Sequence, residues 1–140
     1  MNINKDDLTL VALESMNKTH FEEIEIINSL LIQIDTQADS KTLSLTFEKL
    51  LQHMHEHFQG EEKLMKNSQY PSLNMHKADH DKVLNQARYT EMMWRNKKDI
   101  DILDEYLKEE LIPWLDQHIK AMDTPMADFI YCIKIKADQK

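Results

Sequence analysis

The chain is poor in the residues that make tight turns. Its 140 residues include one glycine and three prolines. A protein of many strands needs frequent turns, which favour both residue types. Leucine, lysine, glutamate, glutamine and methionine, by contrast, are abundant, and all of them form helices readily. The composition therefore predicts an all-α protein.

The length and charge set the broad class of the protein. Residues 1–140 are expected to form one domain, long enough to bury a hydrophobic core. The 17 basic and 25 acidic residues give a net charge of −8, spread along the chain. This charge favours solubility and disfavours binding to nucleic acid or to an anionic membrane.

The number of cysteines and the length of the apolar runs indicate where in the cell the protein is found. Cys132 is the only cysteine, so no internal disulfide can form, and a reducing compartment is the simplest setting. The first ten residues, MNINKDDLTL, lack the basic and then apolar pattern of a signal peptide. No run approaches the ~18 apolar residues of a membrane span. We therefore expect a cytoplasmic protein with no membrane insertion.

Apolar residues recur at steps of three and four, which is the period of one helix face. The expected helices cover residues 17–34, 42–66, 73–96 and 100–122. The connections between them are short, so consecutive helices should run antiparallel. The pattern predicts an up-down-up-down antiparallel four-helix bundle.

The bundle itself is expected to occupy residues 16–123. Residues 1–15 should form an N-terminal arm, from which four apolar side chains can pack against the bundle. These side chains are Leu8, Leu10, Val11 and Leu13.

Single residues mark expected boundaries and irregularities. Ser40 is a suitable N-cap for the second helix. Gly60, the only glycine, lies inside that helix, either as a tolerated surface residue or as a site of close packing beside Glu61. Pro113 should kink or restart the fourth helix, and Pro125 should break it. Beyond that break, residues 124–140 form the expected C-terminal tail, with a short helix over 126–135.

Seven residues form the pattern that indicates function: His20, His57-x3-Glu61, His76-x3-His80 and His118-x4-Asp123. Imidazole nitrogen and carboxylate oxygen are ligands for iron, zinc or manganese. Five imidazoles are too many for one ion and suit a pair of ions that share bridging carboxylates. Burying these groups without a partner would be unfavourable, and metal coordination removes that difficulty. The pattern therefore predicts a metal site in the bundle.

Helix geometry lets most of these side chains converge. Residues four apart lie about 40° apart around the axis, so His57 can point with Glu61 to a common centre. The same holds for His76 and His80. A spacing of five, as between His118 and Asp123, gives about 140°. Asp123 therefore needs a helix end or a local irregularity to turn inward.

Other residues near the pattern have two interpretations. His55 should point to another side of the second helix and be exposed. His53, one turn before His57, is either a bundle-edge or solvated histidine, which we favour, or a partner of the site. Four apolar residues could line a pocket beside the ligands or simply fill the core: Phe21, Phe58, Ile24 and Trp114.

At these residues the chain resembles the hemerythrin family, including its single-domain bacterial members. The resemblance rests on HFQGEEKLM at 57–65, YPSLNMHKADH at 70–80 and WLDQHIKAMD at 114–123, with MNKTH at 16–20. Many members have an Asp-x-Gln-His run where this chain has Asn-Lys-Thr-His. The histidine at position 20 is kept, and its neighbours differ.

The resemblance implies a cofactor of two iron ions in a non-heme di-iron centre. His76, His80 and His118 would bind one iron, and His20 and His57 the other. Glu61 and Asp123 would bridge the ions together with a solvent-derived oxo or hydroxo group. Dioxygen binds in the family at the open position of the iron with two histidines.

The resemblance thus implies reversible dioxygen binding for oxygen storage, delivery or transport. We expect the protein to be a monomer and not an enzyme. A partner that consumes oxygen is possible. The histidine-rich ligand set independently favours modest oxidation states of iron and hence reversible binding. Two alternatives remain open: a di-iron enzyme that acts on nitric oxide or peroxide, and an oxygen or redox sensor module.

Overall fold

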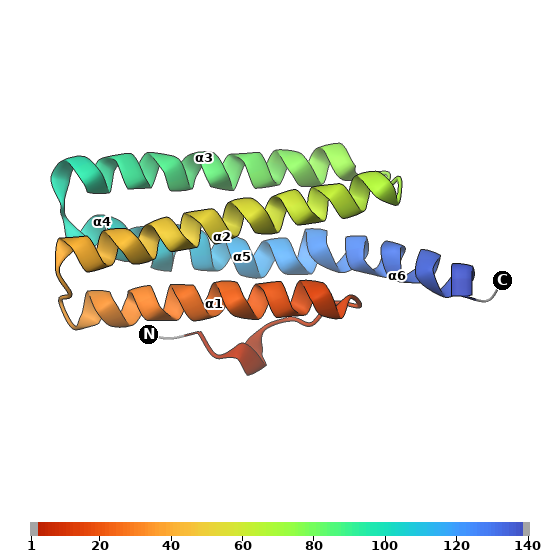
Figure 1. Cartoon of the computed structure of the whole chain (residues 1–140), viewed down its shortest axis with the longest axis horizontal. Coiled ribbons are helices and arrows are strands. Elements are labelled where there is room, and N and C mark those ends of the chain that lie inside the picture. The colour runs from red at the N-terminus through yellow and green to blue at the C-terminus, as the bar shows by residue number, and fades with distance from the viewer. Residues whose placement is uncertain (1–2, 139–140) are drawn as a thin grey trace.

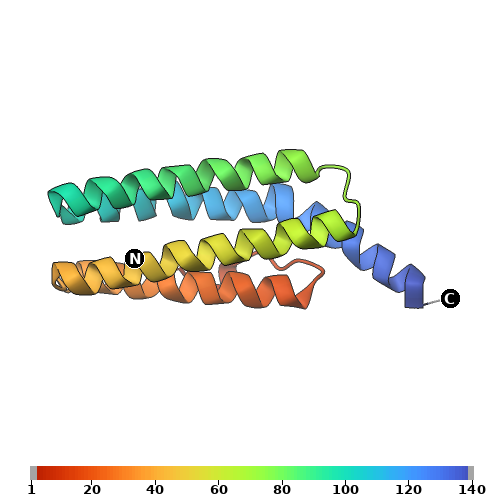
Figure 2. The same ribbon diagram turned by 45° about the horizontal axis from the view of Figure 1, so that its top comes forward.

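The computed structural model describes residues 3–138. Three long helices, α1 (Glu14–Asp35), α2 (Ser40–Asn67) and α3 (Leu73–Lys97), are followed by a fourth rod made of consecutive helical segments. The rods run antiparallel in the order up, down, up, down (Figures 1 and 2). No strand occurs among the described residues. The predicted all-α four-helix bundle is confirmed.

The connections use left-handed backbone without glycine. Gln37, Gln69 and Lys98 have φ angles of 55°, 56° and 53°, and each follows the end of a helix. A residue in this conformation closes a helix by turning the chain out of it. At Lys98 the backbone N–H donates to the carbonyl of Trp94 at 2.8 Å. Short turns between the helices are therefore possible although the chain has one glycine.

The start of α2 differs by one residue from the expectation. Asp39, and not Ser40, is the N-cap, and its side chain accepts a hydrogen bond from the backbone N–H of Thr42 at 2.7 Å. This hydrogen bond favours the charged form and lowers the pKa of Asp39. Both residues are good N-caps, so the sequence alone could not choose between them.

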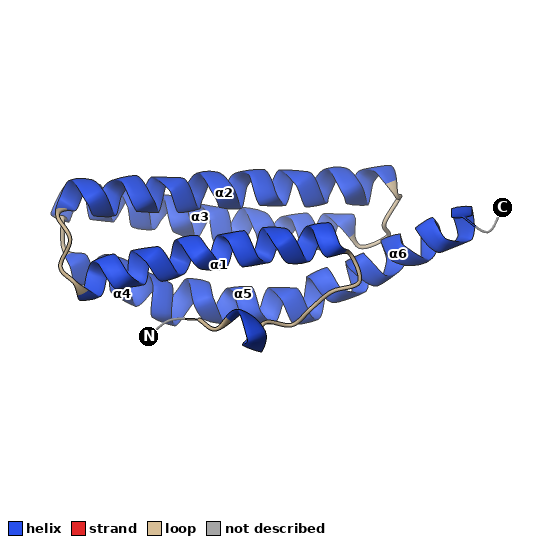
Figure 3. Cartoon of the chain, turned by 60° about the horizontal axis from the view of Figure 1, so that its bottom comes forward, coloured by secondary structure: helices blue, strands red, loops and turns tan. Residues whose placement is uncertain are grey.

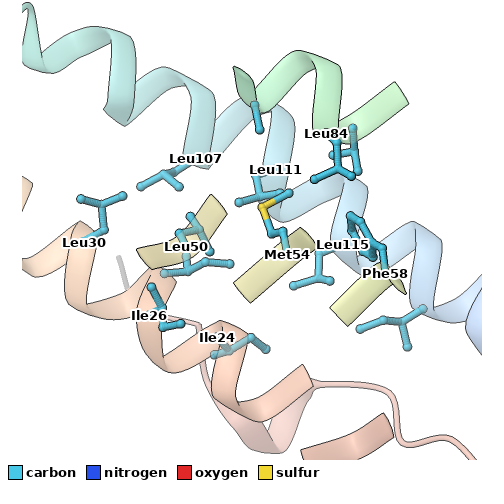
Figure 4. Packing of buried hydrophobic residues seen from close by; sticks show 14 of the residues in the cluster. Ile24, Ile26, Leu30, Leu50, Met54, Phe58, Leu84, Leu107, Leu111 and Leu115 are labelled. Carbon is cyan, nitrogen blue, oxygen red and sulfur yellow. The ribbon is translucent and has the colours of Figure 1, made fainter. Parts of the chain in front are cut away.

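The core lies between the four rods, and Figure 4 shows Leu30, Leu50, Met54, Leu107 and Leu111 packed there from three of them. All five side chains are buried. The apolar faces that the sequence pattern predicted for α1 and α2 therefore point inward.

The N-terminal arm contains the 3-10 turn η1 (Lys5–Asp7) and lies along α1 (Figure 3). Val11 and Leu13 are buried and Leu8 is partly buried, as expected. Leu10 is 64% exposed, so the expectation that it packs against the bundle was wrong.

Two asparagines of α1 hold the arm. The side-chain amide of Asn28 donates to the carbonyl of Ile3 at 2.8 Å and its oxygen accepts from the N–H of Ile3 at 2.7 Å. Asn17 makes the same pair of bonds with Val11, at 3.0 and 2.9 Å. Asparagines eleven residues apart differ by only about 20° around a helix, so both face the arm. We call these two contacts the asparagine clasps.

The fourth rod contains two wide π-helical turns. Its segments are α4 (Ile100–Glu105), η2 (Tyr106–Leu111), α5 (Ile112–His118), η3 (Ile119–Asp123) and α6 (Thr124–Asp138). The segments η2 and η3 are π-helical, with hydrogen bonds between residues five apart.

Each π turn ends two residues before a proline. Pro113 follows η2 and Pro125 follows η3, each as the second residue of the next α-helix. Proline lacks the N–H and collides with a carbonyl in a regular helix, and a wider turn relieves both problems. The predicted break at Pro125 was therefore wrong: α6 continues the rod and extends beyond the bundle (Figures 1 and 3).

Gly60 is a surface residue of α2. A Cβ atom at this position would meet nothing within 4 Å, so the interpretation of close packing was wrong. The Gly60→Ala variant should therefore be more stable by about 0.5–1 kcal/mol, because glycine disfavours a helix interior. Urea denaturation measures this difference. The exposed neighbour Gln59 serves as the control, because Gln59→Ala should change stability by less than about 0.5 kcal/mol. A less stable Gly60→Ala protein would contradict the prediction.

Candidate metal centre

The structure brings all seven predicted residues together inside the bundle. His20 comes from α1, His57 and Glu61 from α2, and His76 and His80 from α3. The fourth rod supplies His118 and Asp123, the last residues of α5 and η3. Every one of the seven is buried.

Their ligand atoms form two overlapping groups, each of which could hold a metal ion. One group has three histidines, namely His76, His80 and His118, and the other has His20 and His57. Glu61 and Asp123 belong to both, and the ligand atoms within each group lie within 4.8 Å of one another.

Glu61 presents one oxygen to each group. Its Oε2 lies 2.6 Å from Nε2 of His57, and its Oε1 lies 3.1 Å from Nε2 of His80 and 3.3 Å from Nε2 of His76.

Asp123 also presents one carboxylate oxygen to each group of histidines. Its Oδ2 lies 3.0 Å from Nε2 of His20, and its Oδ1 lies 3.0 Å from Nε2 of both His76 and His118. Two carboxylates that each face both groups have the arrangement of bridging ligands.

Many of the ligand nitrogen and oxygen atoms are buried but make no hydrogen bond with any described residue. They are Nε2 of His20, His76, His80 and His118, Oε1 of Glu61 and both carboxylate oxygens of Asp123. A buried polar atom without a partner is costly, and a metal ion is a partner for several lone pairs that meet in one space. The donor set therefore fits a pair of metal ions.

The π turn η3 places Asp123. In a π turn the hydrogen bond links residues five apart, and here the N–H of Thr124 donates to the carbonyl of Ile119. Residues five apart, such as His118 and Asp123, then lie nearly above one another. The predicted need for a local irregularity is confirmed, and the alternative of a helix end was wrong.

Three carboxylates contact the outer nitrogens of the histidines. Asp79 Oδ2 lies 2.7 Å from Nδ1 of His118, and Glu62 Oε2 lies 2.9 Å from Nδ1 of His80. Glu23 Oε1 lies 3.3 Å from Nδ1 of His57. Such carboxylates fix the orientation of a metal-binding imidazole and raise its basicity.

The sequence pattern did not predict these three carboxylates. The only indication in the sequence was their closeness to the ligands. Glu62 and Asp79 are adjacent to Glu61 and His80, and Glu23 is one turn after His20. Each, however, contacts a histidine on a different helix, and one sequence does not give that pairing.

His53 and His55 also differ from the favoured expectations. His53 Nδ1 lies 3.3 Å from the same oxygen of Glu23 that contacts His57, so it is a partner of the site, and its side chain is also 19% exposed at the edge of the bundle. His55 lies outside the site, as expected, but is half-buried.

The cluster couples positive and negative charges. Burial alone would raise the pKa of Glu61, but the neighbouring histidines, His57 first, hold it well below its usual value. Burial would lower the pKa of His76, and the carboxylates of Asp123 and Glu61 raise it instead, to about 9. The pKa of Glu23 falls to about 2 because His57 and His53 outweigh its burial. The histidines thus favour the charged form of the carboxylates, and the carboxylates favour the charged form of His76.

The chain matches the family model described as the hemerythrin HHE cation binding domain over residues 9–130. It belongs to the hemerythrin family. The bacteriohemerythrin of Aquifex aeolicus (strain VF5) is 30% identical over 112 residues, which cover 80% of this chain and 85% of that protein. The bacteriohemerythrin of Campylobacter jejuni serotype O:6 is 24% identical over 114 residues, or 81% and 84% of the two chains.

The fold comparison agrees with this membership. A crystal structure of a point mutant superposes with a TM-score of 0.78 at 17% identity, covering 94% of this chain and 97% of the other. At this identity the likeness concerns the fold alone. In this hemerythrin, no helix of residues 3–138 is long and apolar enough to cross a membrane.

Aromatic rings shield the three-histidine side of the hemerythrin cluster. Phe58 stacks on His80 with ring centroids 4.1 Å apart, and Trp114 stacks on His118 at 4.4 Å. Phe58 and Trp114 also meet edge to face at 5.7 Å. The interpretation as core therefore holds for both rings, and each ring also covers a proposed ligand. Ile24 is fully buried, whereas Phe21 is half-buried.

Proposed function

We propose that this hemerythrin binds dioxygen reversibly at a non-heme di-iron centre. The observation that carries the proposal is the sharing of Glu61 and Asp123 between two groups of histidines, with one oxygen of each carboxylate toward each group. Five imidazoles with only two carboxylates offer little negative charge to stabilise highly oxidised iron. The ligand set therefore supports reversible binding of dioxygen over cleavage of its O–O bond.

The proposed ligands of one iron are His76, His80 and His118, and those of the other are His20 and His57. Glu61 and Asp123 are the proposed bridges, with a solvent-derived oxo or hydroxo group between the ions. Ferrous iron at this site would supply the electrons with which dioxygen is held, and the ion with two histidine ligands would be the one with room for dioxygen.

Aromatic side chains limit the access of water to the three-histidine side of the site. Phe58 and Trp114 cover the imidazoles of His80 and His118 with apolar rings. Glu62 and Asp79 hold the same two imidazoles from behind. A dry and rigid site slows irreversible oxidation.

We further propose a role in storage, delivery or transport of oxygen, in the cytoplasm and as a monomer, with supply to an oxygen-consuming protein as one use. We favour dioxygen binding over an enzymatic role, because no acid–base pair beyond the proposed ligands and their carboxylate partners lies at the described site. A side activity on nitric oxide or peroxide stays the alternative.

Optical spectra test the proposal. Iron-loaded ferrous protein under nitrogen should develop charge-transfer absorption when exposed to air and should lose it on deoxygenation. Metal analysis should give two irons per chain. A colour that never reverses would refute reversible binding, and sustained turnover of nitric oxide or peroxide with a reductant would support an enzyme instead.

The contact between Asp79 and His118 gives a separate prediction. Asp79→Asn should lower iron affinity by about 10- to 100-fold, because the imidazole of His118 loses the carboxylate that orients it. Iron content after dialysis against a graded series of chelator concentrations measures the change.

Asp81→Asn on the same helix is the matched control. Asp81 is exposed and pairs with Lys77 at 2.9 Å, away from the histidines. Its replacement should leave iron content unchanged, so equal losses in both variants would count against the role of Asp79.

A further inference from the structure

A pocket of about 510 Å³ lies between α3 and the first half of the fourth rod, where the π-helical segment η2 forms one wall. These two rods pack side by side (Figure 2). None of the seven proposed metal ligands lines the pocket. Its volume is within the range of sites for small molecules. The pocket is therefore a candidate binding site separate from the metal centre, and we call it the η2 pocket.

The charged side chains in the lining of the η2 pocket are all carboxylates, namely Glu105, Glu109 and Glu110. None of them forms an ion pair with a basic side chain of residues 3–138, whereas Asp104 and Lys108 on the same segment pair with each other at 2.8 Å. Neighbouring carboxylates without a counter-charge repel one another, and a cation between them removes that repulsion. The pocket therefore favours a positively charged ligand and disfavours an anion.

A buried phenol lies in the wall of the η2 pocket beside these carboxylates. Tyr106 is 3% exposed, and its Oη makes no hydrogen bond with any described residue. Burial raises the pKa of Tyr106, and the negative charges of Glu110 and then Glu23 raise it further. The pocket carboxylate Glu110 thus acts on the phenol more strongly than Glu23 does, which places the hydroxyl toward the pocket. A buried hydroxyl without a partner is costly, so a hydrogen-bonding ligand in the pocket would stabilise it.

The π turn gathers these groups on one face of the rod. A π turn is wider than an α turn and links residues five apart, so residues four and five apart lie nearly above one another. Tyr106 and Glu110 are four apart, and Glu105 and Glu110 are five apart. The other π turn, η3, places Asp123 at the metal centre in the same way. Both π turns of the rod therefore bring polar groups together.

The η2 pocket also has an apolar part. Tyr89 of α3 is 61% exposed, and Met93 and Ile102 are half-buried. The face of an aromatic ring attracts a cation, and the aliphatic side chains favour hydrocarbon. A bare metal ion suits the pocket less well, because within residues 3–138 only the groups at the metal centre bring three or more ligand atoms within 4.8 Å of one another. The lining therefore fits a cation that carries its charge on a short carbon chain.

We propose that the η2 pocket binds a small organic amine in its protonated, ammonium form. The ammonium group lies between Glu105, Glu109 and Glu110 and donates a hydrogen bond to Oη of Tyr106. The carbon chain lies against the ring of Tyr89. The site is independent of the proposed dioxygen binding, so either proposal can fail without the other.

Isothermal titration calorimetry of the iron-loaded protein with putrescine, a four-carbon diamine, tests the proposal. Butanediol is the matched neutral molecule and should not bind, because it carries no charge. Magnesium chloride at the same ionic strength should not displace putrescine. No heat of binding with putrescine, equal binding of butanediol, or displacement by magnesium would each overturn the proposal.

The Tyr106→Phe variant tests the buried hydroxyl. The affinity for putrescine should fall by about tenfold, because one hydrogen bond to a charged group is lost. The variant keeps the ring that packs on Phe47 with centroids 5.9 Å apart, and the oxygen that it removes has no partner. Its thermal unfolding without putrescine should therefore match that of the native protein. An unchanged affinity in this folded variant would overturn the proposal.

The Glu110→Gln variant tests the carboxylates and should also weaken putrescine binding by about tenfold. Glu48→Gln is the matched control, because Glu48 is exposed on α2, lies outside the η2 pocket and changes the net charge equally. Its affinity for putrescine should stay at the native value. Equal losses in the two variants would show that putrescine follows the net charge of the protein alone, and would overturn the proposal.

The Gln86→Lys variant places an ammonium group of the protein itself in the lining of the η2 pocket. It should abolish putrescine binding, because the new side chain occupies the carboxylates. Gln59→Lys on α2 adds the same charge outside the pocket and should retain most of the binding. Native affinity in the Gln86→Lys protein would place putrescine elsewhere and refute the site.

Discussion

Replacing His118 with alanine is expected to lower iron affinity by more than about a hundredfold, a larger loss than the removal of an outer carboxylate produces. The imidazole faces Asp123 at 3.0 Å, stacks on Trp114 and contacts Asp79. Because metal binding and folding are linked, the midpoint of thermal unfolding should fall by about 5–10 °C in the same variant. Metal analysis and circular dichroism measure the two effects.

His55→Ala is the control for this experiment. His55 lies on α2, two residues from His57, but belongs to neither ligand group. Its replacement should leave iron content and the unfolding temperature nearly unchanged. Full iron loading of the His118→Ala protein would refute the role proposed for His118.

Replacing Phe58 with alanine should cost about 3–5 kcal/mol of folding free energy, because a buried aromatic ring leaves a cavity. Phe58 is 1% exposed. The cavity would open beside His80 and His118, whose rings lie 4.1 and 6.4 Å from that of Phe58. Water could enter there, so the iron centre should also oxidise irreversibly at a higher rate.

Phe47→Ala separates these two effects. Phe47 lies on the same helix, is also 1% exposed and packs on Tyr106, away from the histidines. It should lose similar stability in urea denaturation while the oxidation rate stays near that of the native protein. Equal acceleration in both variants would show that general loosening, and not the cover over the imidazoles, controls oxidation.

The bundle could be predicted because its signals are local. The apolar period in α1 and α2 depends on residues a few positions apart, and local geometry fixes which side chains share a face. The same holds for His57 with Glu61 and for His76 with His80. The spacing of five between His118 and Asp123 even indicated that the helix must be irregular there.

The features that the sequence did not predict depend on packing between segments that are distant in the chain. Each proline of the fourth rod follows a π turn, which a rule about regular helices cannot anticipate, so the break expected at Pro125 was wrong. Leu10 was expected inside because it is apolar, but the asparagine clasps set which arm residues face α1. The carboxylates behind the imidazoles likewise meet them only across helices.

The chain between the two asparagine clasps is longer than the distance that it has to span. Ile3 and Val11 are eight residues apart, and eight extended residues reach about 26 Å. Asn28 and Asn17 are eleven residues apart on a helix, which is only about 17 Å. The turn η1 (Lys5–Asp7) takes up the surplus chain. Each clasp is also made to backbone atoms, so it does not depend on which side chain Ile3 or Val11 carries. The length and sequence of this turn are therefore free to change while the arm stays fastened at both ends.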